Sequence, residues 1–173
     1  MQLQKQIDGN LPKHHIYQLG YPCDTLLACG FPNFPIELSA RNLLEHSKKE
    51  RHQFKLKDMK GLVKALQKPI AVFTYGKKDR AQNVIIEKQQ GNKKYLVGVH
   101  FNTKIGIEIL SVRGIFPKDV EAWLNWIHQG KLLYINKKRI QTLIDQQRTN
   151  FADVEYLDLD SVAKIIENFE NPI

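Results

Sequence analysis

Residues 94–112, KYLVGVHFNTKIGIEILSV, decide the fold predicted for this chain. They contain two runs rich in β-branched and aromatic residues, 94–101 and 105–112, with the turn-like segment NTK between them. Strands joined by so short a connection pair antiparallel, because a parallel crossover needs about a dozen residues or more. The stretch therefore predicts two adjacent antiparallel strands.

Two similar runs come earlier in the chain. IAVFTY covers residues 70–75 and NVIIE covers residues 83–87, and the turn-like segments GKKDR and QQGN separate the successive runs. All three connections are short, so the same argument applies to each neighbouring pair. We expect a four-stranded antiparallel meander.

Helical patterns precede the meander. A short helix is expected over 22–29, and Ser39 is a good N-cap for a second helix. A third helix is expected from about Leu56 and ends at Pro69. Residues 1–15 carry no periodic pattern and are interpreted as a loose N-terminal lead-in.

Helical patterns also follow the meander. They predict helices over 118–129, 136–147 and 160–169, the last capped by Asp160, with a short strand over 131–135. Helices, a contiguous group of strands and then more helices define the α+β class. We expect one α+β domain over 16–150 and an acidic C-terminal segment with a helix over 151–173.

The charge of the chain is unevenly distributed. The net charge is +8 and the pI is about 9.4, which favours a polyanionic partner. From residue 151 onward six acidic residues accompany one base, a net charge of −5, so the preceding part carries +13. Two roles are open for this tail. It could bind the basic part of the chain and so compete with a polyanion such as RNA, or it could complete the core through Val162, Ile165, Ile166 and Phe169.

Targeting and redox signals are few. No apolar stretch approaches the length of a membrane span, and the N-terminus lacks the apolar segment of a signal peptide. We expect no membrane partner and a cytoplasmic location, in the producing cell or in a cell into which the protein is delivered. Cys23 and Cys29 match no metal-binding or redox spacing and are expected to be buried free thiols.

The motifs of nucleotide-dependent enzymes, zinc peptidases and serine hydrolases are absent from the sequence. Acidic residues do not cluster in the strand region as a two-metal nuclease requires, so neither a metal nor another cofactor is expected. RNA can still be cleaved, because its 2′-hydroxyl is an internal nucleophile. Such a reaction needs a base, an acid and cations, which histidine and arginine supply near neutral pH.

His52 is the preferred acid or base. It lies in SKKERHQFKLKDMKGL, residues 47–62, where nearby cations would lower its pKa and keep more of it neutral. The predicted RNA contacts in this run are Lys48, Lys49, Arg51, Lys55, Lys57 and Lys60. His46 is the alternative histidine, and a partly exposed side chain in a basic loop is the structural alternative for His52. His100 lies in a predicted strand, where a surface position is the simplest account.

Ser111 and Arg113 continue the alternating row that begins at Ile105. Glycine follows Arg113, so the strand is expected to end there and the side chains to be re-aimed. Arg113 can bind phosphate through its planar fork and Ser111 can donate a hydrogen bond, although neighbouring backbone could equally satisfy that hydroxyl. Tyr134 combines a ring suited to the core with a hydroxyl that can reach a site.

Four segments in unbroken order resemble a known family: YQLGYPCDTLLACGFPNFPIELS, HQFKLKDMKGLVKALQKPIAVF, IEILSVRG and WLNWIHQGKLLYINKKRIQTLI. Over Ile16 to Gln147 the chain is similar to the C-terminal domain of phage MuF-type head-morphogenesis proteins, which is grouped with the barnase, EndoU, colicin and RelE-like nucleases. The resemblance implies a nuclease-like α+β fold and metal-independent cleavage of RNA by a toxin or phage effector. His52, Ser111 and Tyr134 match the histidine, serine and tyrosine of its motifs.

Two features depart from the family pattern. Arg113 stands where an aromatic residue is expected, which favours phosphate binding. The chain also starts at Met1 without a head-morphogenesis region, so we expect it to act alone or as a separately delivered effector.

The resulting hypothesis is a ribonuclease-like domain that binds RNA through a basic face. Its predicted catalytic residues are His52, Ser111, Arg113 and Tyr134, and Lys137 and Lys138 join the predicted RNA contacts. tRNA is one candidate substrate, and an inhibitor or immunity protein is one candidate partner. The alternatives are a nucleic-acid-binding module without catalysis and a protein-interaction module.

Overall fold

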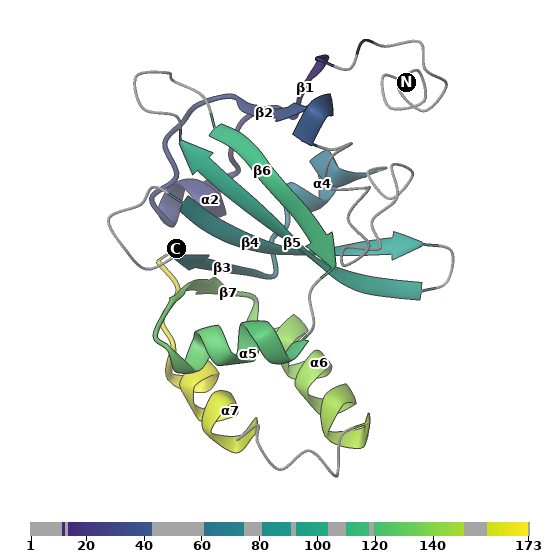
Figure 1. Cartoon of the computed structure of the whole chain (residues 1–173). Helices are drawn as coiled ribbons and strands as arrows, with labels where there is room; N and C mark the ends of the chain where they lie inside the picture. The colour runs from purple at the N-terminus through teal and green to yellow at the C-terminus, as the bar shows by residue number, and fades with distance from the viewer. Residues whose placement is uncertain are drawn as a thin grey trace.

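The computed structural model of the chain describes residues 12, 14–42, 61–74, 81–90, 93–103, 110–117, 120–150 and 159–172. Figure 1 shows a twisted sheet with helices against both of its faces. In chain order the elements are β1 (Ile16–Gln18), α2 (Asp24–Ala28), β2 (Ile36–Ser39), α4 (Leu62–Leu66), β3 (Ala71–Thr74), β4 (Ala81–Gln90), β5 (Lys93–Thr103), β6 (Leu110–Pro117), α5 (Val120–His128), β7 (Leu132–Ile135), α6 (Lys137–Asn150) and α7 (Leu159–Asn168). The α+β class is therefore confirmed.

The sheet is larger than predicted. Its strand order is β1-β2-β6-β5-β4-β3-β7, and β3, β4, β5 and β6 pair antiparallel in succession. The four predicted runs are thus neighbouring antiparallel strands, but they are only part of the sheet, which has seven strands and in which β2 pairs with β6 in parallel. β1 and β2 span only 3 and 4 residues, too few for a period-2 pattern to be recognised.

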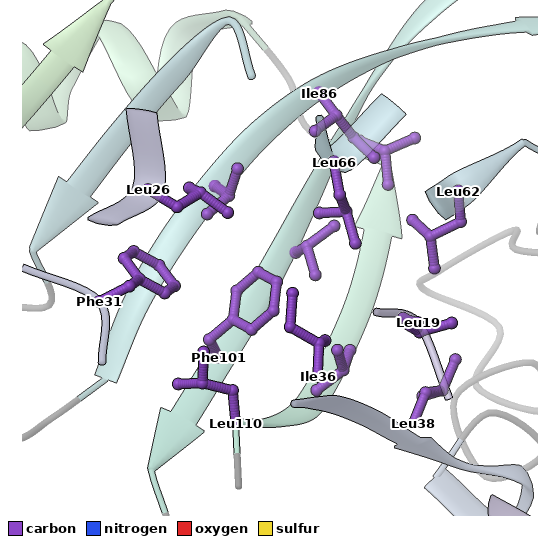
Figure 2. Packing of buried hydrophobic residues seen from close by; sticks show 14 of the residues in the cluster. Leu19, Leu26, Phe31, Ile36, Leu38, Leu62, Leu66, Ile86, Phe101 and Leu110 are labelled. Atoms are coloured by element: carbon purple, nitrogen blue, oxygen red, sulfur yellow. The ribbon is translucent and has the colours of Figure 1, made fainter. Parts of the chain in front are cut away.

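The α2/α4 face of the sheet carries one core. Alternate strand side chains pack there against Leu26 of α2 and against Leu62 and Leu66 of α4. Figure 2 shows these leucines with several of their partners. The strand residues in this core include Ile36, Leu38, Val72, Val84, Ile86, Val97, Val99, Phe101, Leu110 and Val112. Burial of this apolar surface is the main force that holds α2 and α4 on the sheet.

The opposite face, here the α5–α7 face, carries a second core. Its strand members include Ala71, Phe73, Ile85 and Leu96. The helices contribute Trp123, Leu124, Ile127, Ile140, Ile144, Val162 and Ile166, with Ile165 and Phe169 packed against them. The predicted packing role of the last helix is confirmed.

Helix boundaries follow local backbone chemistry. The Oγ atom of Ser39 accepts a hydrogen bond from the backbone N–H of Asn42 at 3.1 Å, which confirms the predicted N-cap. Gly61 has a φ of 76°, a left-handed conformation, so α4 begins at Leu62 and the predicted helix does not continue through Gly61. Its expected start at Leu56 lies outside the described residues. α7 begins at Leu159, so Asp160 lies in its first turn and is not its cap.

The C-terminal residues cover the β7 edge of the sheet. The side-chain amide of Asn171 accepts a hydrogen bond from the N–H of Ile135 at 2.9 Å and donates one to its C=O at 3.0 Å. Lys137 donates from Nζ to the backbone oxygen of Glu167 at 2.8 Å. Asn171 thus supplies the donor and acceptor that a further strand would supply.

Two further predictions concern the cysteines and a membrane span. Cys23 and Cys29 are free thiols, as expected. Cys29 is buried, whereas Cys23 is only partly buried, which corrects the expectation for Cys23. No helix in the described part of the chain combines the length and the apolar character that a bilayer crossing requires.

Candidate functional site

Ser111 lies on β6 and points to the α5–α7 face. Its neighbours Leu110 and Val112 are buried in the core of the other face, and successive strand residues point to opposite faces. Ser111 is directly opposite Glu37 of β2 and Asn102 of β5. Glu37 in turn is opposite Gln18 of β1. Gln18, Glu37, Ser111 and Asn102 therefore form a polar row across four neighbouring strands.

The polar row lies beside the helices α5 to α7. The described core under these helices contains residues of β3, β4, β5 and β7 and none of β1, β2 or β6. Ser111 is 7% exposed, whereas Glu37 and Asn102 are partly exposed. A buried hydroxyl thus lies between two side chains that solvent reaches.

The pair Asn83 and His100 adjoins the polar row. His100 is two residues from Asn102 on β5 and therefore shares its face. The Nδ1 atom of His100 is 3.0 Å from the Oδ1 atom of Asn83, which is directly opposite on β4. Asn83 is only 4% exposed and His100 is partly exposed. The simple surface position predicted for His100 is therefore corrected to a half-buried, oriented ring.

Arg113 lies in a β-bulge next to this pair. Phe101 is opposite Val112 and His100 is opposite Gly114, so Arg113 is an extra residue on β6. The prediction that the strand ends at this point is wrong, because β6 continues to Pro117. A bulge bends a strand and changes the direction of the side chains around it, and bulges are common beside active sites.

Asn42 contacts β6 beside the bulge. Asn42 donates from Nδ2 to the backbone oxygen of Val112 at 3.4 Å, and it is the last described residue before position 61. His52 and the alternative His46 lie outside the described residues, as do the predicted contacts Lys48, Lys49, Arg51, Lys55, Lys57 and Lys60.

Tyr134 lies elsewhere on the sheet. It is opposite Val72 and packs against the core of the α2/α4 face, whereas Ser111 points to the other face. β5, β4 and β3 separate β6 from β7, a distance of about 19 Å at the usual strand spacing. Burial raises the pKa of Tyr134, and the nearby thiols of Cys29 and Cys23 raise it further. The structure does not bring Tyr134 and Ser111 together.

Lys137 and Lys138 are exposed at the start of α6, directly after β7. Lys137 already donates to the C-terminal end of α7. Both lysines therefore lie at the edge of the sheet remote from the polar row.

Sequence reasoning missed Asn83, His100 and Glu37 as one group with Ser111. A signal for the part of the site on β5 is visible: Val97, Val99 and Phe101 alternate with Gly98, His100 and Asn102, so His100 and Asn102 share the face opposite the apolar side chains. The contribution of β2 has no such signal, because its parallel pairing with β6 is a tertiary property. The described residues contain no group of three or more histidines, cysteines or acids that could hold a metal ion.

Residues 43–142 match a family model described as the phage MuF-C-terminal domain. The match includes β3 to β7 and more than half of the chain. The chain belongs to this family. No curated protein and no solved structure matches it. Within this phage MuF C-terminal domain, Ser111, Asn83 and His100 lie inside the matched region, whereas Gln18 and Glu37 come from strands that precede it.

Proposed function

We propose that this phage MuF C-terminal domain binds RNA on the α5–α7 face of its sheet, over β5 and β6, and cleaves it without a metal ion. The observation that carries the proposal is the half-buried His100, held by Asn83 beside Ser111 and the Arg113 bulge. Such a fixed imidazole is suited to proton transfer near neutral pH. A net charge of +8 favours attraction of the RNA backbone.

The proposed reaction is an internal transesterification. The 2′-oxygen of one nucleotide attacks the adjacent phosphorus and the bond from phosphorus to the 5′-oxygen breaks. A base removes the 2′-hydroxyl proton and an acid delivers a proton to the departing 5′-oxygen. The products are a 2′,3′-cyclic phosphate and a 5′-hydroxyl, so no water, metal or further reactant is consumed.

The residues take separate roles in this proposal. His100 and His52 are the two candidates for the proton transfers, and Asn83 orients His100. Arg113 and Ser111 bind the phosphate, because a guanidinium and a hydroxyl both donate to its oxygens. Tyr134 is left out, since it lies on the other face, about 19 Å away by strand spacing.

The test is direct. Purified protein is incubated with total RNA and with tRNA in excess EDTA, and fragments are analysed for cyclic phosphate ends. The proposal predicts cleavage that survives chelation. Activity that disappears in EDTA and returns with magnesium contradicts it, and salt-sensitive binding without any turnover identifies a binding module instead.

The variant His100→Ala makes the test specific to the site. It should lower the cleavage rate by about 100-fold or more, the usual scale for acid or base catalysis. His128→Ala is the matched control, because His128 is exposed in the last turn of α5. Equal rates for the two variants would remove His100 from the mechanism.

A further inference from the structure

Glu37 brings a carboxylate to the candidate site from a strand outside the region matched by the family. It is directly beside Ser111 in the parallel pair of β2 and β6, so the two side chains share the α5–α7 face. Its Oε1 atom accepts a hydrogen bond from Nε2 of Gln18 at 2.6 Å. A carboxylate has about four acceptor positions, and Gln18 occupies one of them. Glu37 is thus held in place with further capacity to accept hydrogen bonds.

An acid at an RNA-binding surface has a restricted set of partners. Phosphate repels it, because like charges at close range are unfavourable. The neutral donors of a nucleotide are the ribose 2′-hydroxyl and the base N–H groups. In the proposed reaction the 2′-hydroxyl lies next to the scissile phosphate. Ser111 and Arg113, the proposed phosphate ligands, lie on the strand adjacent to Glu37.

The spacing of the strands fits this arrangement. β6 separates β2 from β5, so Glu37 and Asn102 lie about 10 Å apart across it. His100 lies two residues further along β5, about 7 Å. A nucleotide lying over β6 would therefore have a carboxylate on one side and an imidazole on the other.

We propose that Glu37 accepts the hydrogen bond of the ribose 2′-hydroxyl and so makes the site select RNA over DNA. The inference rests on the proposed function, because it takes the polar row as the RNA site. The 2′-hydroxyl is the group by which a protein distinguishes the two nucleic acids. Glu37 acts here as a specificity-determining residue.

The experiment measures binding in a variant that cleaves RNA slowly. His100→Ala and the double variants His100→Ala with Glu37→Ala or Glu37→Gln are titrated with fluorescent single-stranded RNA and with DNA of the same sequence. The His100→Ala protein should bind the RNA at least about tenfold more tightly than the DNA, the scale of a hydrogen bond to a charged group. Glu37→Ala should remove that preference by weakening RNA binding alone. Glu37→Gln should keep part of it, since an amide oxygen still accepts.

Two controls separate charge and folding from recognition. Glu170→Gln makes the same change of charge at an exposed position after α7 and should leave the RNA preference intact. Circular dichroism confirms that each variant is folded.

The outcomes distinguish the two proposals. Equal loss of RNA and DNA affinity in Glu37→Ala, or an unchanged RNA preference, overturns the role of Glu37 while cleavage by the wild type can still stand. Failure of the wild type to bind RNA overturns both. Loss of the RNA preference in Glu37→Ala alone, with the controls unchanged, supports the inference.

Discussion

The imidazole of His100 and the amide of Asn83 form a cross-strand hydrogen-bonded pair, with Nδ1 of the histidine 3.0 Å from Oδ1 of the asparagine. An amide oxygen only accepts, so Nδ1 carries the hydrogen in this pair. In the neutral ring the second nitrogen, Nε2, is then the acceptor. Asn83 therefore fixes both the orientation of the ring and the nitrogen that can take up a proton.

Replacement of Asn83 tests this orienting role. Asn83→Ala should lower the cleavage rate less than His100→Ala does, because the imidazole remains but loses its partner. Asn83→Asp keeps an acceptor at the same place and should restore part of the rate. Single-turnover cleavage gives the rates and RNA titration gives the affinities. A purely structural role predicts a loss of thermal stability without any rescue of rate by the aspartate.

Asn171 offers a test of how the sheet edge is closed. Asn171→Ala leaves the N–H and C=O of Ile135 without the partners they now have. Since Asn171 is partly exposed, water replaces some of the loss, and we expect the free energy of unfolding to fall by about 1 to 2 kcal/mol. Urea denaturation measures the change. Asn168→Ala is the control, because its exposed side chain donates to Lys164 within α7 and not to the sheet edge in the described part of the chain, and an equal effect of both variants would contradict the edge role.

Ionisation of the Cys29 thiol should lower the stability of the folded protein at high pH. Burial, and then the charge of Cys23, raise the pKa of its thiol from 9.0 to about 11. The folded protein thus keeps the proton that the unfolded chain releases, so this contribution is complete below pH 9 and is lost as the pH rises from about 9 to 11. Denaturation of wild type and Cys29→Ala across this range should show a steeper decline in the wild type. Parallel pH profiles would show that the thiol is not the cause.

The parts of the fold that were predictable are those with long, periodic patterns. Residues 97–102 alternate large apolar side chains with Gly98, His100 and Asn102, which defines both faces of β5, and α5, α6 and β7 lie where their patterns indicated. β1 and β2 are short and depend on pairing with residues far away in the sequence, such as Leu110 with Ile36. Glu37 could not be grouped with Ser111 for the same reason. The helical apolar pattern continues through Gly61 without a break, so the sequence did not indicate that the left-handed backbone of Gly61 would start α4 only at Leu62.

The last prediction decides between the histidines. The sequence favours His52 as the acid or base of the proposed cleavage, with His46 as its alternative. The described geometry adds His100 as a further candidate. If His52 and His100 are the base and the acid of one reaction, each alanine variant should lower the rate by about 100-fold or more and leave RNA affinity nearly unchanged. The double variant should be little slower than the slower single variant, because the effects of residues that act as a unit are not additive.

Lys55→Ala and Lys57→Ala should instead weaken binding to every RNA and reduce the salt dependence of binding by about one charge. Loss of rate in His46→Ala with a wild-type rate in His52→Ala would move the role to His46. Full activity in all three histidine variants would leave the basic run and the sheet face as binding surfaces only, and the catalytic assignment would be wrong.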